Sequence, residues 1–152
     1  RILFSGDLGR SDDLLMRPPD APPAADTVLI ESTYGDREHP DTDILQDLAP
    51  ALQRLAQRGG VAVVPVFAVG RAQALLHAIG LLKARGEIPP SLPVFLDSPM
   101  AVHTTHLFEQ HPGEHRLTAT ESRALTHSAT MIGAVNSKSS ATPTGNAWMA
   151  KK

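Results

Sequence analysis

The sequence predicts an α/β fold, with a parallel-type sheet that carries helices on both of its faces. Short apolar runs rich in β-branched residues alternate with longer stretches in which apolar residues recur at three- and four-residue steps. The connections between successive apolar runs are long enough to return the chain for parallel pairing. With 152 residues, 41% of them hydrophobic, the chain can bury a core of its own.

The first two expected strands both end in polar turns. Apolar residues 2–4 run into the sequence SGDLG, which places Asp7 just beyond the end of the strand. A stiff connection follows, because four of the six residues 18–23 are proline and proline fixes the backbone φ angle. The second strand, residues 27–32, includes Glu31 and leads into the polar loop TYGDREHP.

A helix and a strand make up the next expected pair. The helix ends at Gly59 and Gly60, and its apolar positions lie mainly three and four residues apart: Ile44, Leu45, Leu48, Leu52 and Leu55. The uninterrupted apolar run at 61–67 is typical of a parallel strand that is buried on both faces. Pro65 cannot donate a ladder hydrogen bond, which indicates that the strand ends near it.

The chain repeats this alternation up to residue 135. The expected elements are helices at 71–84, from Pro99 onward and at 118–127, and strands at 92–97 and 129–135. Residues 136–152 are rich in Ser, Thr, Ala and Gly and have no hydrophobic period. We therefore expect this tail to be poorly ordered or foreign to the fold.

The composition excludes several kinds of chemistry. The chain has no cysteine, which rules out disulfides, thiolate zinc sites and cysteine nucleophiles. No apolar run reaches the roughly 20 residues that cross a bilayer, and no signal peptide is recognisable, so a cytoplasmic setting without membrane contact is expected. Because the net charge is −2, any contact with nucleic acid must come from a local basic patch.

Candidate chemistry lies at or just beyond the ends of the expected strands. The clusters that contain Asp7, Glu31 and Ser98 can converge, because the carboxyl ends of parallel strands line one edge of a sheet. Asp7 has two interpretations at this point. It is either a turn former, the commoner role of Asp beside Gly, or a ligand or catalytic carboxylate.

Gly70 and Arg71 lie between the apolar run and the next helix. Free backbone N–H groups at a helix start, with an arginine beside them, suit a phosphate. Alternatively, Gly70 only permits the turn and Arg71 stays solvated. The GxxxxGKS/T pattern of a nucleotide triphosphatase is absent. His103 and His106 stand three residues apart without a third ligand nearby, which favours a surface role over metal binding.

Four motifs, in this order and at this spacing, resemble one known family. They are FSGDLGR, LIESTYGDREHP, VVPVFAVGRAQALL and VFLDSPMAV. The chain resembles the β-CASP family of RNA-processing nucleases, a branch of the metallo-β-lactamase fold, from Ile2 to about Ala124. The resemblance implies that residues 1–35 end a metallo-β-lactamase half and that residues 36–135 begin a β-CASP domain.

The resemblance also implies roles for single residues. Asp7 matches the aspartate that bridges two zinc ions, which favours a metal ligand over a turn former. Glu31 matches the acidic residue that supports a catalytic histidine near the zinc site. Gly70, Arg71 and Ser98 match loops that lie near the RNA backbone, where phosphate contact is the expected role. The implied cofactor is therefore a pair of zinc ions, and the implied partner is RNA.

Two parts of the family pattern have no counterpart in the sequence, namely the HxHxDH motif and the later histidines. We therefore expect a zinc-dependent RNA nuclease for the parent protein and no activity for this piece by itself. Two alternatives remain open: a non-catalytic RNA-binding or assembly module, and a metallo-β-lactamase-fold hydrolase of small esters. An apolar sheet edge left uncovered in the piece would also favour homo-oligomers.

Overall fold

The computed structural model describes residues 1–38 and 43–132. These residues form, in chain order, β1 (Ile2–Phe4), β2 (Thr27–Leu29), α1 (Ile44–Arg58), α2 (Arg71–Ala84), β3 (Phe95–Asp97), α3 (Pro99–Gln110), α4 (Ala119–His127) and β4 (Thr130–Ile132). None of these helices has the length and apolarity that a membrane crossing needs. The expected tail at 136–152 lies outside the described residues.

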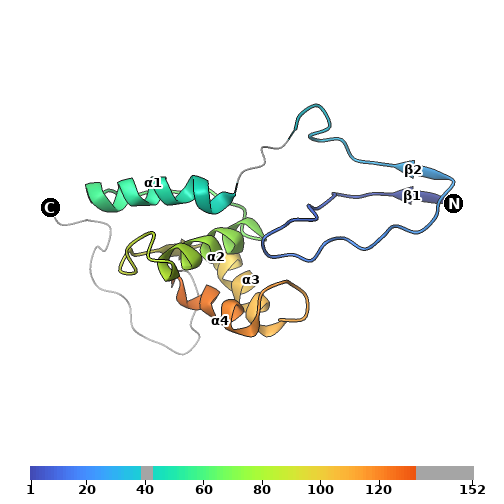
Figure 1. Ribbon diagram of the computed structural model, residues 1–152. Coiled ribbons are helices and arrows are strands. Elements are labelled where there is room, and N and C mark those ends of the chain that lie inside the picture. The colour runs from blue at the N-terminus through green and yellow to red at the C-terminus, as the bar shows by residue number, and fades with distance from the viewer. Residues whose placement is uncertain (39–42, 133–152) are drawn as a thin grey trace.

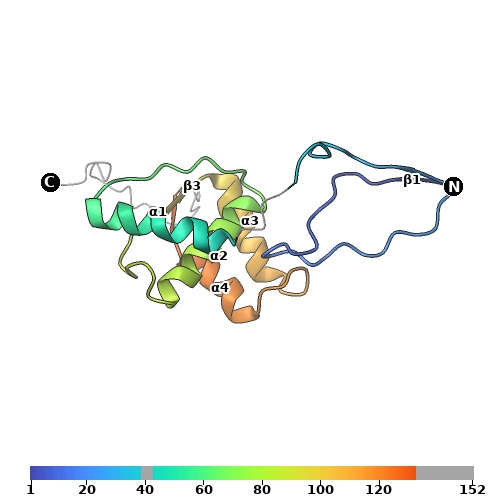
Figure 2. The ribbon, with the colours of Figure 1, turned by 45° about the horizontal axis from the view of Figure 1, so that its top comes forward.

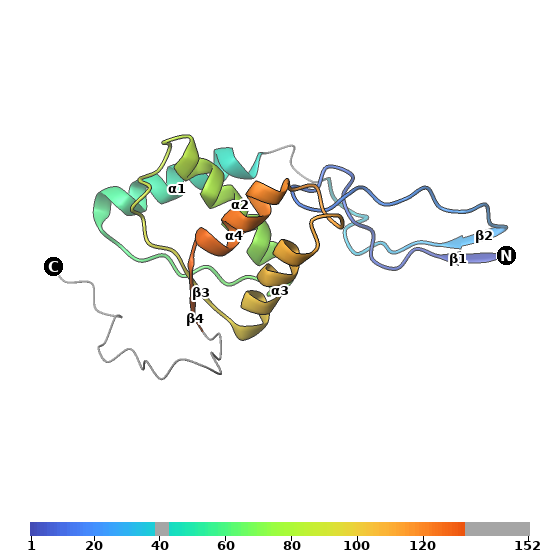
Figure 3. The same cartoon turned by 90° about the horizontal axis from the view of Figure 1, so that it is seen from below.

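The strands pair in parallel, as expected, but they form two separate sheets. Phe4 of β1 lies opposite Leu29 of β2, and Leu96 of β3 lies opposite Met131 of β4. Figure 3 shows β3 and β4 side by side near the helices, whereas β1 and β2 lie at the far end of an N-terminal arm. The α/β class with parallel pairing is thus confirmed, and within residues 1–38 and 43–132 the strands do not join into one sheet.

The strand expected at residues 61–67 is wrong for this structure. The segment belongs to no strand and forms a long connection between α1 and α2 (Figure 2). Its side chains are largely open to solvent: Val63 is 89% exposed and Phe67 is 71% exposed. A strand buried on both faces needs a hydrogen-bonded neighbour, and the described residues supply none to this segment. Self-association through these exposed residues stays a prediction.

Local signals set the helix boundaries. The Asp43 carboxylate caps α1 by accepting a hydrogen bond from the first turn, and α1 ends at Gly59, whose φ of 68° is left-handed. Ser98 caps α3 through its side chain. Thr118 caps α4 in a reciprocal capping box with Glu121. The expected helices are therefore all present, close to their expected bounds.

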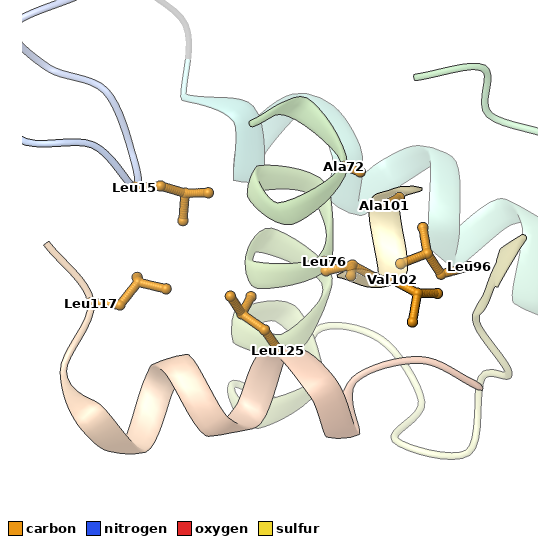
Figure 4. Packing of buried hydrophobic residues seen from close by; sticks show 8 residues of the cluster. All are labelled: Leu15, Ala72, Leu76, Leu96, Ala101, Val102, Leu117 and Leu125. Atoms are coloured by element: carbon orange, nitrogen blue, oxygen red, sulfur yellow. The ribbon is translucent and has the colours of Figure 1, made fainter. Parts of the chain in front are cut away.

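Helix α2 lies between two hydrophobic cores. The first core joins α2 to β3, α3 and α4 (Figure 4) and consists of Leu15, Ala72, Leu76, Leu96, Ala101, Val102, Leu117 and Leu125. The second core joins α2 to α1 and consists of Leu45, Ala49, Leu52, Ala78, Ile79, Leu82 and Ile88. Because α2 contributes to both, it is buried on more than one side, and its start is fixed relative to α3.

The N-terminal arm meets the helices at Leu15. Figure 1 shows the arm extending away from the helices toward the β1–β2 pair. Leu15 is 1% exposed and packs in the first core, and its carbonyl accepts a hydrogen bond of 2.7 Å from the Arg116 N–H. The Asp13 carboxylate accepts hydrogen bonds from the N–H groups of Leu15 and Met16, which shapes the turn here. Leu15 is thus the anchor of the arm.

Candidate functional site

The loops that contain Asp7 and Glu31 lie side by side after β1 and β2. Ser5 joins them. Its N–H donates to the Leu29 carbonyl at 2.9 Å, and its hydroxyl oxygen accepts from the Glu31 N–H at 2.9 Å. This arrangement follows from the parallel pairing of two strands that end at the same level. The first two polar clusters therefore converge, as expected.

The Glu31 carboxylate is held in the ionised form by its surroundings. Its Oε2 accepts a hydrogen bond of 3.0 Å from the Thr33 N–H, and the backbone of Leu8 adds a further favourable contact. The hydrogen bonds from Thr33 are the largest cause of a pKa below the usual range for this carboxyl. Glu31 is therefore an anion at neutral pH, half-buried between the two loops.

Asp7 lies in the adjacent loop and is exposed to solvent. It makes no hydrogen bond or ion pair with any residue of the described segments. Nor do those segments contain a group of three or more His, Cys, Asp or Glu residues that could hold a metal ion. His103 and His106 belong to no such group, and Nδ1 of His106 lies 4.0 Å from Oε2 of Glu109. A two-zinc centre therefore does not fit the donors present in the described part of the chain.

Gly70 and Arg71 form the turn into α2, where the backbone folds back on itself. Gly70 has a φ of 80°, which favours glycine. The Arg71 N–H donates to the Val69 carbonyl at 3.0 Å, and the Ala72 N–H donates to the Phe67 carbonyl at 3.2 Å. The backbone N–H groups expected to be free are therefore occupied, and the group that remains for an anion is the Arg71 side chain.

The Arg71 guanidinium is held by an aromatic ring rather than by a carboxylate. It lies 5.3 Å from the centre of the Phe67 ring, an arrangement that restrains the side chain but leaves its donors open. Within the described residues it has no ion-pair partner. The first turn of α2 also contains no acidic residue, so no carboxylate there competes with an external anion for the guanidinium.

Ser98 lies at the start of α3. Its hydroxyl oxygen accepts a hydrogen bond of 3.2 Å from the Ala101 N–H, so Ser98 is the N-cap residue of α3. Pro99 follows at the first helical position, and the first turn of α3 contains no acidic residue.

Gln73 connects the starts of α2 and α3, a role that the sequence analysis did not predict. Its amide oxygen accepts from the Gly70 N–H at 2.8 Å, and its amide nitrogen donates to the Ala101 carbonyl of α3 at 3.2 Å. Ala72 and Ala101 belong to the same core cluster (Figure 4). A glutamine three residues after a helix N-cap is a sequence signal for capping, but it does not reveal the bond to α3.

The candidate residues thus form two separate groups. One group is Asp7 with Glu31 on the arm. The other is Gly70 and Arg71 at the start of α2 with Ser98 at the start of α3, two helices that the Gln73 side chain joins. Convergence of the Ser98 cluster with the first two is not observed, because β3 pairs with β4 and not with β1 or β2. In the part of the chain that the structure describes, no hydrogen bond or ion pair connects the two groups.

The parallel strand pairs and the helices around them define an α/β protein. The Beta-Casp domain profile matches residues 72–149, about half of the chain. The chain belongs to the Beta-Casp family, which confirms the resemblance drawn from its motifs.

Known relatives match a larger part of the chain. Over 108 residues it is 39% identical to Ribonuclease TTHA0252 of Thermus thermophilus, a match that covers 70% of this chain and 24% of that protein. It is 33% identical over 114 residues to Cleavage and polyadenylation specificity factor 73 of Drosophila melanogaster, covering 70% and 17%. It is 36% identical over 103 residues to Endoribonuclease YSH1 of Mycosarcoma maydis, covering 66% and 12%. The chain thus spans a quarter or less of the length of these relatives.

Proposed function

We propose that the complete protein is a metal-dependent RNA nuclease that hydrolyses phosphodiester bonds, with zinc as its metal. Family membership supports this proposal, as do the names of relatives that describe ribonucleases. In this proposal Asp7 is one zinc ligand, and Glu31 positions a neighbouring catalytic group. Because the described residues lack a full ligand set, this chain is expected to bind RNA without cleaving it.

The observation that carries the proposal is that the Arg71 guanidinium stacks on a ring and makes no ion pair within the described residues. A guanidinium that stacks on Phe67 and has no carboxylate partner in the described segments is preorganised to meet an external anion. The N-terminal ends of α2 and α3 add partial positive charge, and neither first turn contains an acid. A phosphodiester is the anion that fits, since backbone contacts position RNA without reading its bases.

The test is the affinity of the chain for a fluorescein-labelled single-stranded RNA, followed by anisotropy at several salt concentrations. Arg71→Ala is expected to weaken binding and to reduce the slope of log affinity against log salt by about 0.7, the value for one lost phosphate contact on a single strand. Arg54→Ala removes the same charge from the exposed side of α1 and is the matched control. Equal binding by the Arg71 variant, the Arg54 variant and the wild type would contradict the proposal.

A further inference from the structure

Gln73 has an unusually full set of hydrogen bonds for a residue with no exposed surface. Its side chain is 0% exposed, at the third position of α2. Burying an amide is costly unless both of its ends are hydrogen-bonded. A leucine or methionine would fill the same space without that requirement. The contribution of Gln73 to the structure therefore lies in its hydrogen bonds and not in the space that it fills.

One set of these bonds fixes the turn before α2. The Gln73 amide oxygen accepts from the Gly70 N–H at 2.8 Å, and its amide nitrogen donates to the Ala68 carbonyl at 3.1 Å. The turn between these two residues includes Val69, whose carbonyl accepts from the Arg71 N–H. Gln73 thus holds the backbone from which the Arg71 side chain starts.

The second set of bonds reaches α3. Besides the Ala68 carbonyl, the two N–H groups of the Gln73 amide share two acceptors in α3, the Ala101 carbonyl at 3.2 Å and the Thr105 hydroxyl oxygen at 3.1 Å. The Thr105 hydroxyl in turn donates to the Ala101 carbonyl at 2.7 Å. One buried side chain therefore joins the turn before α2 to the first turns of α3, the helix that Ser98 caps.

We propose that Gln73 is a positioning residue, which sets the Arg71 guanidinium at a fixed place relative to the start of α3 so that both meet one stretch of RNA backbone. This inference rests on the proposed function, because it assumes that Arg71 contacts phosphate. Two groups restrain Arg71, namely the Val69 carbonyl and the Phe67 ring. Both lie in the segment directly before α2, and Gln73 holds the turn at the end of that segment. Without Gln73 the guanidinium keeps its charge but loses its fixed direction.

The test combines Gln73→Met with Arg71→Ala in a double-mutant cycle of RNA binding. Methionine has a similar length and no amide, so Gln73→Met removes all four contacts. Arg71→Ala is expected to weaken binding about tenfold, as for a lost charged hydrogen bond, and Gln73→Met by a similar factor. The double variant is expected to bind no more weakly than Arg71→Ala, because Gln73 acts through Arg71.

A stability control separates positioning from a general loss of structure. Leu82→Ala removes a fully buried side chain that packs in the second core. The turn before α2 contributes no residue to that core. It is expected to lower the melting temperature at least as much as Gln73→Met and to leave RNA affinity unchanged at a temperature where both variants are folded. If Gln73→Met does not fold, Gln73→Leu replaces it, because leucine also lacks the amide. Thr105→Val removes only the hydroxyl contact to Gln73 and tests the link to α3 separately.

Each result has a definite meaning. If Arg71→Ala binds as the wild type does, the proposed function fails, since Arg71 then contacts no phosphate. If Arg71→Ala weakens binding while Gln73→Met and Thr105→Val bind normally, the proposed function stands and the role of Gln73 is overturned. Additive losses in the double variant would also overturn it, because Gln73 would then act independently of Arg71.

Discussion

Replacement of Leu15 by alanine tests the anchor of the N-terminal arm. The side chain is 1% exposed and packs in the first core. Complete burial of a leucine contributes roughly 1.5–3 kcal/mol by transfer from water, and Leu→Ala changes in cores cost about 2–5 kcal/mol once the remaining cavity is included. We expect Leu15→Ala to lower the free energy of unfolding by about 2–3 kcal/mol, the lower part of that range, because the arm can move to fill part of the space.

The assay is urea unfolding followed by circular dichroism, with Leu8→Ala as the matched control. Leu8 lies on the same arm and is 50% exposed, so its loss should cost less than about 0.5 kcal/mol. Hydrogen exchange at the Arg116 N–H, which donates to the Leu15 carbonyl, should be faster in the Leu15 variant because the anchor opens more often. Equal effects of the two substitutions would show that Leu15 does not anchor the arm.

Three further predictions concern metal content and pH. The zinc content after dialysis should be well under one ion per chain, because the described residues hold no group of three ligands; a value near two would contradict this. Burial lowers the pKa of His77 below 6.5, so the unfolded state binds more protons and stability should decrease as the pH falls below about 6.5. His77→Gln should reduce that decrease, and an identical pH profile in urea unfolding would contradict the assignment. The Thr33 hydrogen bonds lower the pKa of Glu31 below 4.5, so its stabilisation of the loop is present above that pH and lost as the pH falls through the lowered value. The Thr33 amide shift in NMR should titrate with a midpoint below 4.5, and a midpoint at or above 4.5 would show that the bond does not favour the carboxylate.

The helices could be predicted from the sequence because their signals are local. Asp43 precedes the apolar period of α1 and Gly59 follows it, and Ser98 with Pro99 marks the start of α3. Such caps act within one turn of the chain and depend little on distant residues. The motifs around Asp7 and Arg71 were local in the same sense, which is why the family was recognisable.

The arrangement of the strands could not be predicted from the same evidence. An apolar run such as residues 61–67 shows that a segment is suited to burial, but it does not show whether neighbours are available to bury it. In the described chain, that run is exposed. Leu15 and Gln73 were missed for a related reason. Each makes its hydrogen bonds with residues far away in the sequence. Leu15 accepts from Arg116, and Gln73 donates to Ala101 and Thr105.

We propose that this chain contributes an RNA-contacting surface to a Beta-Casp nuclease, while the described residues hold no complete metal site. One measurement tests both halves: a labelled single-stranded RNA is incubated with the chain in zinc and, separately, in EDTA, and its anisotropy and length are followed together. We expect the same binding in both conditions and an RNA that stays intact. Binding that requires zinc, or an RNA that is cut, would contradict the claim, and absence of binding in both conditions would remove its basis.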